Sequence, residues 1–434
     1  MTAEIAVFNR SGIALAADSA VTTTIGISEK IYNNADKLFE LSKHNPVALM
    51  IYNNASVCGA PWELLIKAFR KNLGIQSFAL IEGYAQSFFD FIKNDVKIIT
   101  PDMQKRFFFS IFSDVVLPLI LQEVQNIDVT SFLQANNKFP STAQYHNYIQ
   151  SRAIKKSQEL SISDFYIDFD LNDLALAKSE CDNVVQEICA LRIEQDSSSA
   201  AHPYPQSLLN ALSELFSLYI CKESDLSTYS GIVFAGYGDQ EYYPVIESHM
   251  IYGVFNKKIM RSLKNTKNNH GQSNGIYPFA QDEEVHTFMQ GCSNGIVNCI
   301  SDSIHISMDA IKSEITNAIC MQNQNINRQA IENAFDTVIS MQSKYIGNAI
   351  QDHMTVNHVQ KVLSILGSLA KVDLGYMAES LVNLTAFKRK VSNDSDSVGG
   401  PIDVAVLSKG EGFVWLKRKH YFSKELNYQY FNRQ

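Results

Sequence analysis

Several residue types are scarce, and each shortage excludes a class of protein. Cysteine occurs only seven times in 434 residues, in an odd number and at wide spacing, and no C-x-x-C pair is present. This pattern excludes a disulfide framework and a cysteine zinc site, and it favours a reducing compartment, the cytoplasm. Lys and Arg (37) are outnumbered by Asp and Glu (45), so the net charge of −8 provides no general field for nucleic acid.

Long apolar segments are also lacking. No uncharged apolar run approaches the roughly 18 residues that a membrane-spanning helix requires. The N-terminus has no basic region followed by an apolar core, which argues against a signal peptide. The ten histidines are scattered, and His353 and His358 stand five residues apart, which does not place two ligands on one helix face. We therefore expect no membrane span, no metal and no cofactor.

The first 24 residues carry the most informative pattern. Apolar side chains alternate on both sides of a tight turn at Ser11-Gly12, at positions Ile5, Val7, Ile13, Leu15 and Ala17. This period of two predicts two short strands joined as a hairpin.

Thr2 follows the initiator methionine and is small enough for methionine aminopeptidase to remove Met1. The new chain start would carry a free α-amine beside the Thr2 hydroxyl, and the two together form a nucleophile and its base. Asp18 ends the second predicted strand, where its carboxylate can reach back to the chain start. The alternative interpretation is structural: Asp18 caps the strand and binds Ser19 or Thr22.

The segment Gly12–Thr22, GIALAADSAVT, resembles the G-x-x-x-A-x-D-S-x-x-T segment of proteasome β subunits and the bacterial HslV protease, which are N-terminal nucleophile (Ntn) hydrolases. With Thr2 counted as the first mature residue, three positions coincide with the family's catalytic Asp, the following Ser and a substrate-binding Thr: Asp18, Ser19 and Thr22. The resemblance implies a longer bacterial proteasome-like member with an α+β fold, a four-layer αββα sandwich of two antiparallel sheets between helix layers.

The resemblance assigns further site residues. The family's lysine at the start of the third strand corresponds to Lys37, with Lys30 as the alternative. The turn that donates a backbone N–H to the oxyanion corresponds to Asn53-Asn54, and asparagine tolerates a left-handed backbone at such a turn. For Lys37 the structural alternative is a solvated lysine at a strand edge.

The resemblance also covers the stretch before the closing strands. Family members place an Asp and a Ser just before a Gly-Gly pair, and here Asp394, Asp396 and Ser397 precede Gly399-Gly400. These three residues are candidates to support the site; in the structural alternative the two carboxylates are turn residues. The family's Gly-Ser-Gly tripeptide is missing, and the nearest segment is 273–275.

The remaining chain is mainly helical by pattern. Apolar residues at helical spacing predict helices over 61–72, 77–94, 101–126, 141–160, 171–195, 205–221, 279–300, 303–322, 328–343, 351–369 and 374–391. Alternation predicts strands over 37–41, 47–52, 231–237, 243–254 and, at the end, within 401–417. The polar stretches 22–28 and 257–275 are predicted to be loops. We expect one domain over residues 1–434, with a helical insertion over 95–205.

These residues predict a threonine-type hydrolase of peptide or other amide bonds, active after removal of Met1. The Thr2 hydroxyl would attack the carbonyl, and the turn at Asn53-Asn54 would receive the oxyanion. The Lys37 ammonium, held by Asp18, would lower the pKa of the α-amine base. The alternative is a non-catalytic proteasome-like protein that serves assembly or binding. By analogy the resemblance also implies a homo-oligomer, with a ring and an ATPase partner as further options.

Overall fold

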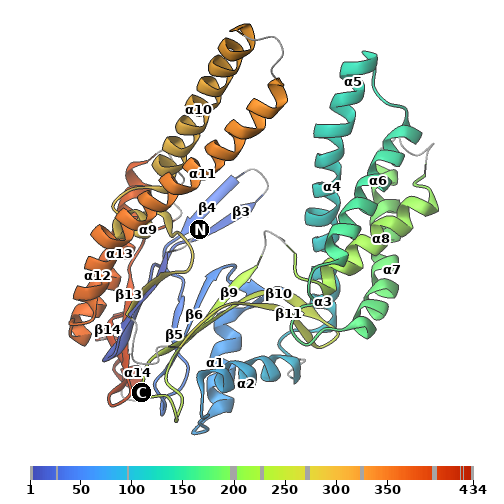
Figure 1. Ribbon diagram of the computed structural model, residues 1–434. Coiled ribbons are helices and arrows are strands. Elements are labelled where there is room, and N and C mark those ends of the chain that lie inside the picture. The colour runs from blue at the N-terminus through green and yellow to red at the C-terminus, as the bar shows by residue number, and fades with distance from the viewer. Residues whose placement is uncertain are drawn as a thin grey trace. The chain divides into compact units, whose positions relative to one another are not determined.

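The computed structural model describes residues 3–25, 28–94, 97–195, 203–224, 229–268, 274–322, 327–392, 398–420, 422–423 and 425–431. The chain forms two compact units. The first contains Met1–Ala35 and Asn269–Gln434, and the second is the continuous segment Asp36–Asn268. Each unit contains one five-stranded antiparallel sheet together with helices (Figure 1). The α+β fold class with two antiparallel sheets is therefore confirmed, whereas the expectation of one domain over the whole chain stays a prediction.

The strands of the first unit are β1 (Glu4–Asn9), β2 (Gly12–Ala17), β3 (Val21–Ile25), β4 (Ser28–Tyr32), β12 (Gly275–Pro278), β13 (Asp403–Ser408) and β14 (Gly412–Lys417). Its helices are α9 (Glu283–Gln290), α10 (Asn294–Gln322), α11 (Arg328–Met354), the π-helix η3 (Thr355–Val359), α12 (Gln360–Leu366), α13 (Lys371–Val391) and α14 (Tyr428–Phe431). The five-stranded sheet has the order β12-β1-β2-β13-β14, and β3 and β4 form a separate hairpin.

Helix α13 packs across β1, β2 and β13. Side chains alternate along a strand, so one face of the sheet presents its small and branched residues to the helix. This buried cluster includes Ile5, Val7, Ala14, Ala16, Val404 and Val406 from the strands and Leu374, Ala378 and Leu381 from α13. This packing stabilises the strands on which the candidate site depends.

Helices α10 and α11 lie side by side as a long helical hairpin (Figure 1). Few of their side chains are buried. Among the described side chains, α10 buries only Thr316, and α11 buries Ile339 and Met354. The hairpin is therefore helical without a substantial core of its own.

The strands of the second unit are β5 (Leu38–Glu40), β6 (Val47–Asn53), β7 (Ser56–Val57), β8 (Ala60–Pro61), β9 (Ser230–Gly236), β10 (Val245–Phe255) and β11 (Lys258–Asn268). Its helices are α1 (Trp62–Leu73), α2 (Ile81–Asn94), α3 (Pro101–Ser110), the π-helix η1 (Ile111–Val116), α4 (Leu117–Glu123), the π-helix η2 (Val124–Val129), α5 (Thr130–Asn136), α6 (Thr142–Ser161), α7 (Leu171–Gln195) and α8 (Gln206–Cys221).

The sheet of the second unit has the order β11-β10-β9-β6-β5. Helices α1 and α2 cover one face of it through an aromatic cluster in which Phe88 and Phe89 contact the Phe234 ring of β9 at centroid distances of 5.7 and 5.8 Å. The helices from α3 to α8, here called the helical insertion, form a second cluster that includes Phe112, Leu117, Leu212, Leu215 and Phe216.

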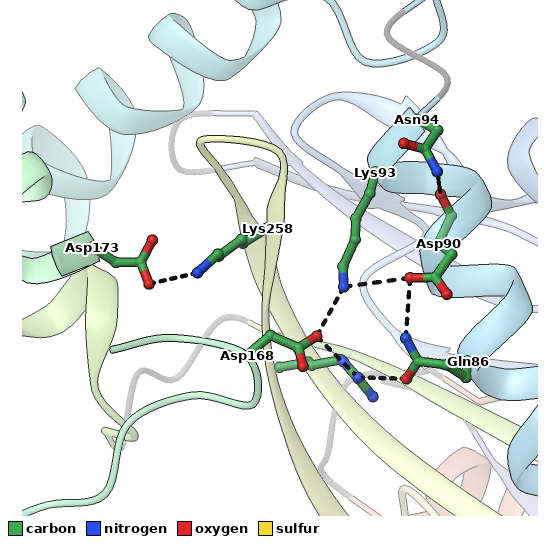
Figure 2. A network of polar contacts seen from close by, with 8 residues as sticks. Gln86, Asp90, Lys93, Asn94, Asp168, Asp173 and Lys258 are labelled. Carbon is green, nitrogen blue, oxygen red and sulfur yellow. Dashed lines mark hydrogen bonds and ion pairs between the residues drawn. The ribbon is translucent and has the colours of Figure 1, made fainter. Parts of the chain in front are cut away.

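A polar network ties the helical insertion to α2 and β11 (Figure 2). Asp168, between α6 and α7, accepts hydrogen bonds from Lys93 of α2 at 2.9 Å and from Arg261 of β11 at 3.3 Å. The Arg261 guanidinium also donates to Gln86 at 3.1 Å. The insertion is thus held to the sheet by charge as well as by apolar contact.

One helical stretch among the described residues, Pro101–Asn136, is long and apolar enough to cross a membrane by length and composition. The core helix of a soluble protein passes the same test. In this stretch Phe112, Leu117 and Ile120 are buried and join the cluster shared with α8. Of the apolar 18-residue window in this stretch, 33% is buried, so packing accounts for part of its apolar content, and the absence of a membrane span stays a prediction.

Most predicted elements are present, and the two predicted polar loops are wrong. Residues 257–275 contain β11, which pairs with β10 along its length, and residues 22–28 are occupied in part by the β3–β4 hairpin. Strand β11 lies at the edge of its sheet, where lysine and other polar residues replace the usual apolar alternation. The polar composition of this segment therefore predicted a loop where the structure has strand β11.

Candidate active site

Asp18 directly follows β2 and is fully buried. Its carboxylate accepts three backbone hydrogen bonds: Oδ1 from the Ala3 N–H at 3.1 Å, and Oδ2 from the N–H groups of Ala20 at 3.2 Å and Gly399 at 2.9 Å. The Asp18 N–H donates in turn to the Ala3 carbonyl at 3.1 Å. One side chain thus fastens the beginning of β1 to the loop that leads into β13.

The first hairpin determines this position. Its turn is stabilised by Asn9, whose Oδ1 accepts hydrogen bonds from the Ser11 N–H at 2.8 Å and the Ser11 hydroxyl at 2.6 Å. The resulting register pairs the first residue of β1 with the last residue of β2. Asp18 is therefore placed opposite Ala3, as the alternating pattern predicted for a carboxylate that reaches back to the chain start.

Ser19 fastens three segments through three polar groups. Its N–H donates to the Gly399 carbonyl at 3.1 Å, and its hydroxyl donates to the Pro401 carbonyl at 2.5 Å. Its own carbonyl accepts a hydrogen bond from the Ala35 N–H at 3.1 Å. Both Asp18 and Ser19 therefore have a structural role in the first unit, whatever further role they serve.

The Gly399-Gly400 pair leads into β13, which pairs with β2 beside Asp18. Gly400 has φ of +77°, and a Cβ there would lie 2.9 Å from the Asn33 carbonyl oxygen, so the position requires glycine. Four predicted site residues lie outside the described part of the chain: Thr2, Asp394, Asp396 and Ser397.

The two lysine candidates have different surroundings. Lys37 directly precedes β5 and is 3% exposed, and its carbonyl accepts a hydrogen bond from the Ile51 N–H at 2.9 Å. Lys30 lies in β4 and is exposed. An ammonium is buried only where other groups compensate its charge. Of the two lysines, Lys37 is therefore the one whose surroundings stabilise a buried ammonium. Thr22 lies in β3, paired with β4.

Asp18 belongs to the first unit and Lys37 to the second. The structure describes each of them within its own unit, so the expected ion pair between them stays a prediction. The same holds for the substrate-binding role expected for Ser19 and Thr22.

Asn53 ends β6 with φ of +62°, the left-handed conformation that the sequence predicted for this turn. The Asn54 N–H points to the Tyr229 carbonyl at 3.4 Å, a long hydrogen bond. The turn is therefore formed as expected, while its role as oxyanion donor stays a prediction.

A cluster beside this turn was not foreseen from the sequence. Tyr52 is buried, its hydroxyl lies 3.4 Å from the Ser248 hydroxyl, and the Lys264 ammonium lies 5.2 Å above its ring. Burial raises the pKa of Tyr52 in spite of these two neighbours, so its hydroxyl stays protonated at neutral pH. A Cβ on Gly231 would lie 2.0 Å from the Tyr52 ring, and this required glycine is the only sequence signal for the cluster.

Alternative nucleophiles and metal ligands are less suitable. All seven cysteines are free, and burial raises the pKa of the Cys58 and Cys221 thiols to about 12, which disfavours the reactive thiolate. Within the described ranges, no group of three or more His, Cys, Asp or Glu side chains is placed to hold a metal ion.

Comparison with known proteins gives a likeness in structure only. No family model matches the chain, and no curated protein matches it in sequence. A (Gly-1) mutant of Anbu from Hyphomicrobium sp. strain MC1 matches over 100% of this chain and 94% of its own, with 9% identity and a TM-score of 0.26. Anbu from the same organism matches over 99% and 94%, with 8% identity and a TM-score of 0.28. Likeness at this level supports no conclusion about activity or assembly.

The assignment to proteasome β subunits and HslV is therefore wrong. No family model supports it, and the two solved structures described above are of Anbu. The reason lies in the motif itself. In GIALAADSAVT, the Asp18 and Ser19 side chains make backbone hydrogen bonds that fasten the first hairpin to the loop before β13, so the motif also has a structural role that does not depend on the family.

Proposed function

We propose that this protein is a threonine-type N-terminal nucleophile hydrolase that cleaves peptide or other amide bonds after removal of Met1. The observation that carries the proposal is the hydrogen bond from the Ala3 N–H to Asp18 Oδ1 at 3.1 Å. Ala3 is the residue directly after Thr2, so a buried carboxylate is fixed one residue from the proposed nucleophile. Such fixed placement is what a catalytic group requires.

The proposed chemistry uses the Thr2 hydroxyl as nucleophile and its own α-amine as base. The hydroxyl oxygen forms a bond to the substrate carbonyl carbon, its proton passes to the amine, and the amine then protonates the leaving group. Water hydrolyses the resulting ester and restores Thr2. The oxyanion is received at the turn of Asn53 and Asn54, where Asn53 has a left-handed backbone conformation.

Lys37 is the proposed cation beside the amine, and chain connectivity supports this choice. The Ala35 N–H is bonded to the Ser19 carbonyl, next to Asp18, and Lys37 follows two residues later. Its Cα therefore lies within about 7.6 Å of the Ala35 Cα for any orientation of the second unit. An ammonium near the α-amine lowers the amine's pKa from its ordinary value of about 7.7–8.0 and increases the fraction of free base.

Intact-mass measurement of the protein from cells tests the proposal first, because retained Met1 would block the amine and overturn it. If Met1 is absent, Thr2→Ala should reduce amide hydrolysis by about 10³-fold or more. Thr337→Ala, on an exposed position of α11, is the control and should keep full activity.

Lys37→Ala and Lys30→Ala then separate the two lysines. Loss of the Lys37 ammonium should lower the rate. It should also move the rising limb of the kcat/KM pH profile to higher pH, because the amine's pKa returns toward its ordinary value. Lys30→Ala should leave the profile unchanged. The reverse result would transfer the role to Lys30.

A second candidate function is non-catalytic assembly or binding, in which copies of this chain form a homo-oligomer. Helices α10 and α11 favour it. These helices expose large apolar side chains, among them Ile306 at 71% and Tyr345 at 70%. Exposed apolar patches mark surfaces that meet other proteins. Sedimentation velocity tests this candidate: self-association that is lost in Ile306→Ser supports it, and a monomer at all concentrations contradicts it.

A further inference from the structure

A pocket of about 600 Å³ lies within the second unit, between the helical insertion and the β10–β11 hairpin. Its walls come from α4, α6 and α8, from the segments that follow α6 and α8, and from β10 and β11. We propose that this pocket binds an organic cation, the basic side chain of the amide substrate. The inference rests on the proposed hydrolase function for the identity of the ligand, while the pocket's charge and shape stand by themselves.

The charge of the walls is strongly unbalanced. Three carboxylates line the pocket, those of Glu159, Asp164 and Glu223, against one ammonium, that of Lys156. Lys156 is already paired with Glu159 at 3.3 Å. Asp164 and Glu223 therefore share the space without a cation of their own among the described lining residues.

The pKa of the Glu223 carboxyl reflects this charge imbalance. Burial and the negative charge of Asp164 both raise the pKa of the Glu223 carboxyl above its ordinary value. The nearby Lys222 does not relieve it, because its ammonium donates to the carbonyls of Ser161 and Ser163 at 2.7 and 2.6 Å. A ligand cation placed between the two carboxylates would remove the repulsion, which gives the pocket an electrostatic preference for positive charge.

The other walls suit an organic cation. Tyr219, Met250 and Tyr252 provide apolar and aromatic surface for an alkyl stem and a ring face for a guanidinium or ammonium. Ser262 of β11 also lines the pocket and is 3% exposed.

The pocket is connected to the predicted oxyanion turn within the same unit. The Tyr252 ring lies 5.9 Å from the Tyr229 ring, which lies 6.2 Å from the Tyr52 ring at the end of β6. The Tyr229 carbonyl is the group that accepts from the Asn54 N–H. These two steps correspond to about three or four extended residues, so a peptide with its scissile carbonyl at the turn reaches the pocket with a nearby basic side chain.

The experiment uses the Thr2→Ala protein, which cannot turn over the ligand, and two alanine-rich octapeptides that differ only in one central residue. One peptide carries arginine and the other carries citrulline, its uncharged isostere. In fluorescence anisotropy at low salt, the arginine peptide should bind at least about tenfold more tightly. Asp164→Asn combined with Glu223→Gln should remove this preference, whereas Glu187→Gln, an exposed carboxylate on α7, should leave it intact.

Equal affinity for the two peptides, no detectable binding of the arginine peptide, or an unchanged preference in the double variant would overturn the proposal. A melting curve of the double variant that matches the parent confirms that the pocket is still folded. Failure of the cation pocket and failure of the hydrolase proposal give different results. Without hydrolase activity the wild type cleaves neither peptide but still prefers arginine, and without a cation pocket it cleaves both peptides at similar rates.

Discussion

The helical insertion and the α10–α11 hairpin are both made of long helices, yet they are stabilised in different ways. Helix α8 of the insertion buries a continuous series of side chains that includes Leu212, Leu215 and Phe216. Helix α10 is nearly twice as long and buries only Thr316 among its described side chains. Helix formation in water depends mainly on the burial of an apolar face, so the two regions must differ in where their stability originates.

The hairpin relies on local contacts. Asn327 caps α11 by accepting a hydrogen bond from the Ala330 N–H at 3.2 Å, and Arg328 pairs with Glu332 four residues on at 2.8 Å. A cap of this kind contributes about 0.5–2 kcal/mol. The insertion instead shares one apolar cluster among α4, α6, α7 and α8. Long helices are therefore no sign of a core, and each helix has to be judged by what it buries.

The largest effect that tests this contrast is expected from aromatic truncation. Phe216→Ala in α8 removes a fully buried ring from the insertion cluster and should lower the free energy of unfolding by about 3–5 kcal/mol. Tyr345→Ala in α11 removes a ring that is 70% exposed and should change it by less than about 0.5 kcal/mol. Urea denaturation of both variants checks this. Comparable losses would show that the hairpin is packed against something in solution.

Ion pairs provide the next test. In the insertion, Arg152 holds Asp128 through two hydrogen bonds at 2.7 and 3.0 Å, and both side chains are about one-fifth exposed. A double-mutant cycle to alanine should give a coupling of about 0.5–1 kcal/mol. The corresponding cycle on Lys312 and Asp336, which join α10 to α11 at the surface, should give no measurable coupling. Equal coupling would remove the distinction.

The smallest effect concerns pH and the network that holds the insertion. Burial alone would raise the pKa of Asp168, but the hydrogen bond and charge of Lys93, together with Arg261, outweigh it and hold the pKa below its ordinary value. A carboxyl with a lowered pKa contributes stability above its unfolded pKa of about 3.9, and this is lost as pH falls through the folded value.

Asp168→Asn should therefore lower stability by a few tenths of a kcal/mol at pH 7, because the side chain is more than one-third exposed, and the difference should vanish at lower pH. Denaturant melts of wild type and variant between pH 7 and pH 2 measure the difference. A difference that grows on acidification would contradict the lowered pKa.

The sequence predicted the helices well because most of them present a clear apolar face. The segment 171–195 was predicted with the bounds that α7 has. Prediction failed at β11, where Lys264 and its polar neighbours conceal an edge strand. The helix predicted over 279–300 was also wrong in part, because Gly291, with φ of +78°, ends α9 and a new helix begins three residues later. Such breaks depend on backbone geometry that composition does not record.

For the candidate site, the sequence located Asp18 because the carboxylate stands at a fixed register from the chain start. It also anticipated the left-handed turn at Asn53. It did not anticipate Tyr52 with Ser248 and Lys264, because these residues come together only when β6 and the β10–β11 hairpin share a sheet. Long-range pairing of that kind is invisible to a local pattern.

The strand order of the first unit has a consequence for synthesis on the ribosome. Strand β2 is made at the start of translation, but its neighbour β13 is made near the end, with Ala16 opposite Val404. At about 5–20 residues per second, the nascent β2 waits on the order of tens of seconds for this partner. The second unit is one continuous segment and can fold during that interval. Asp18 receives the Gly399 N–H only afterwards, so the candidate active site is among the last parts of the molecule to mature.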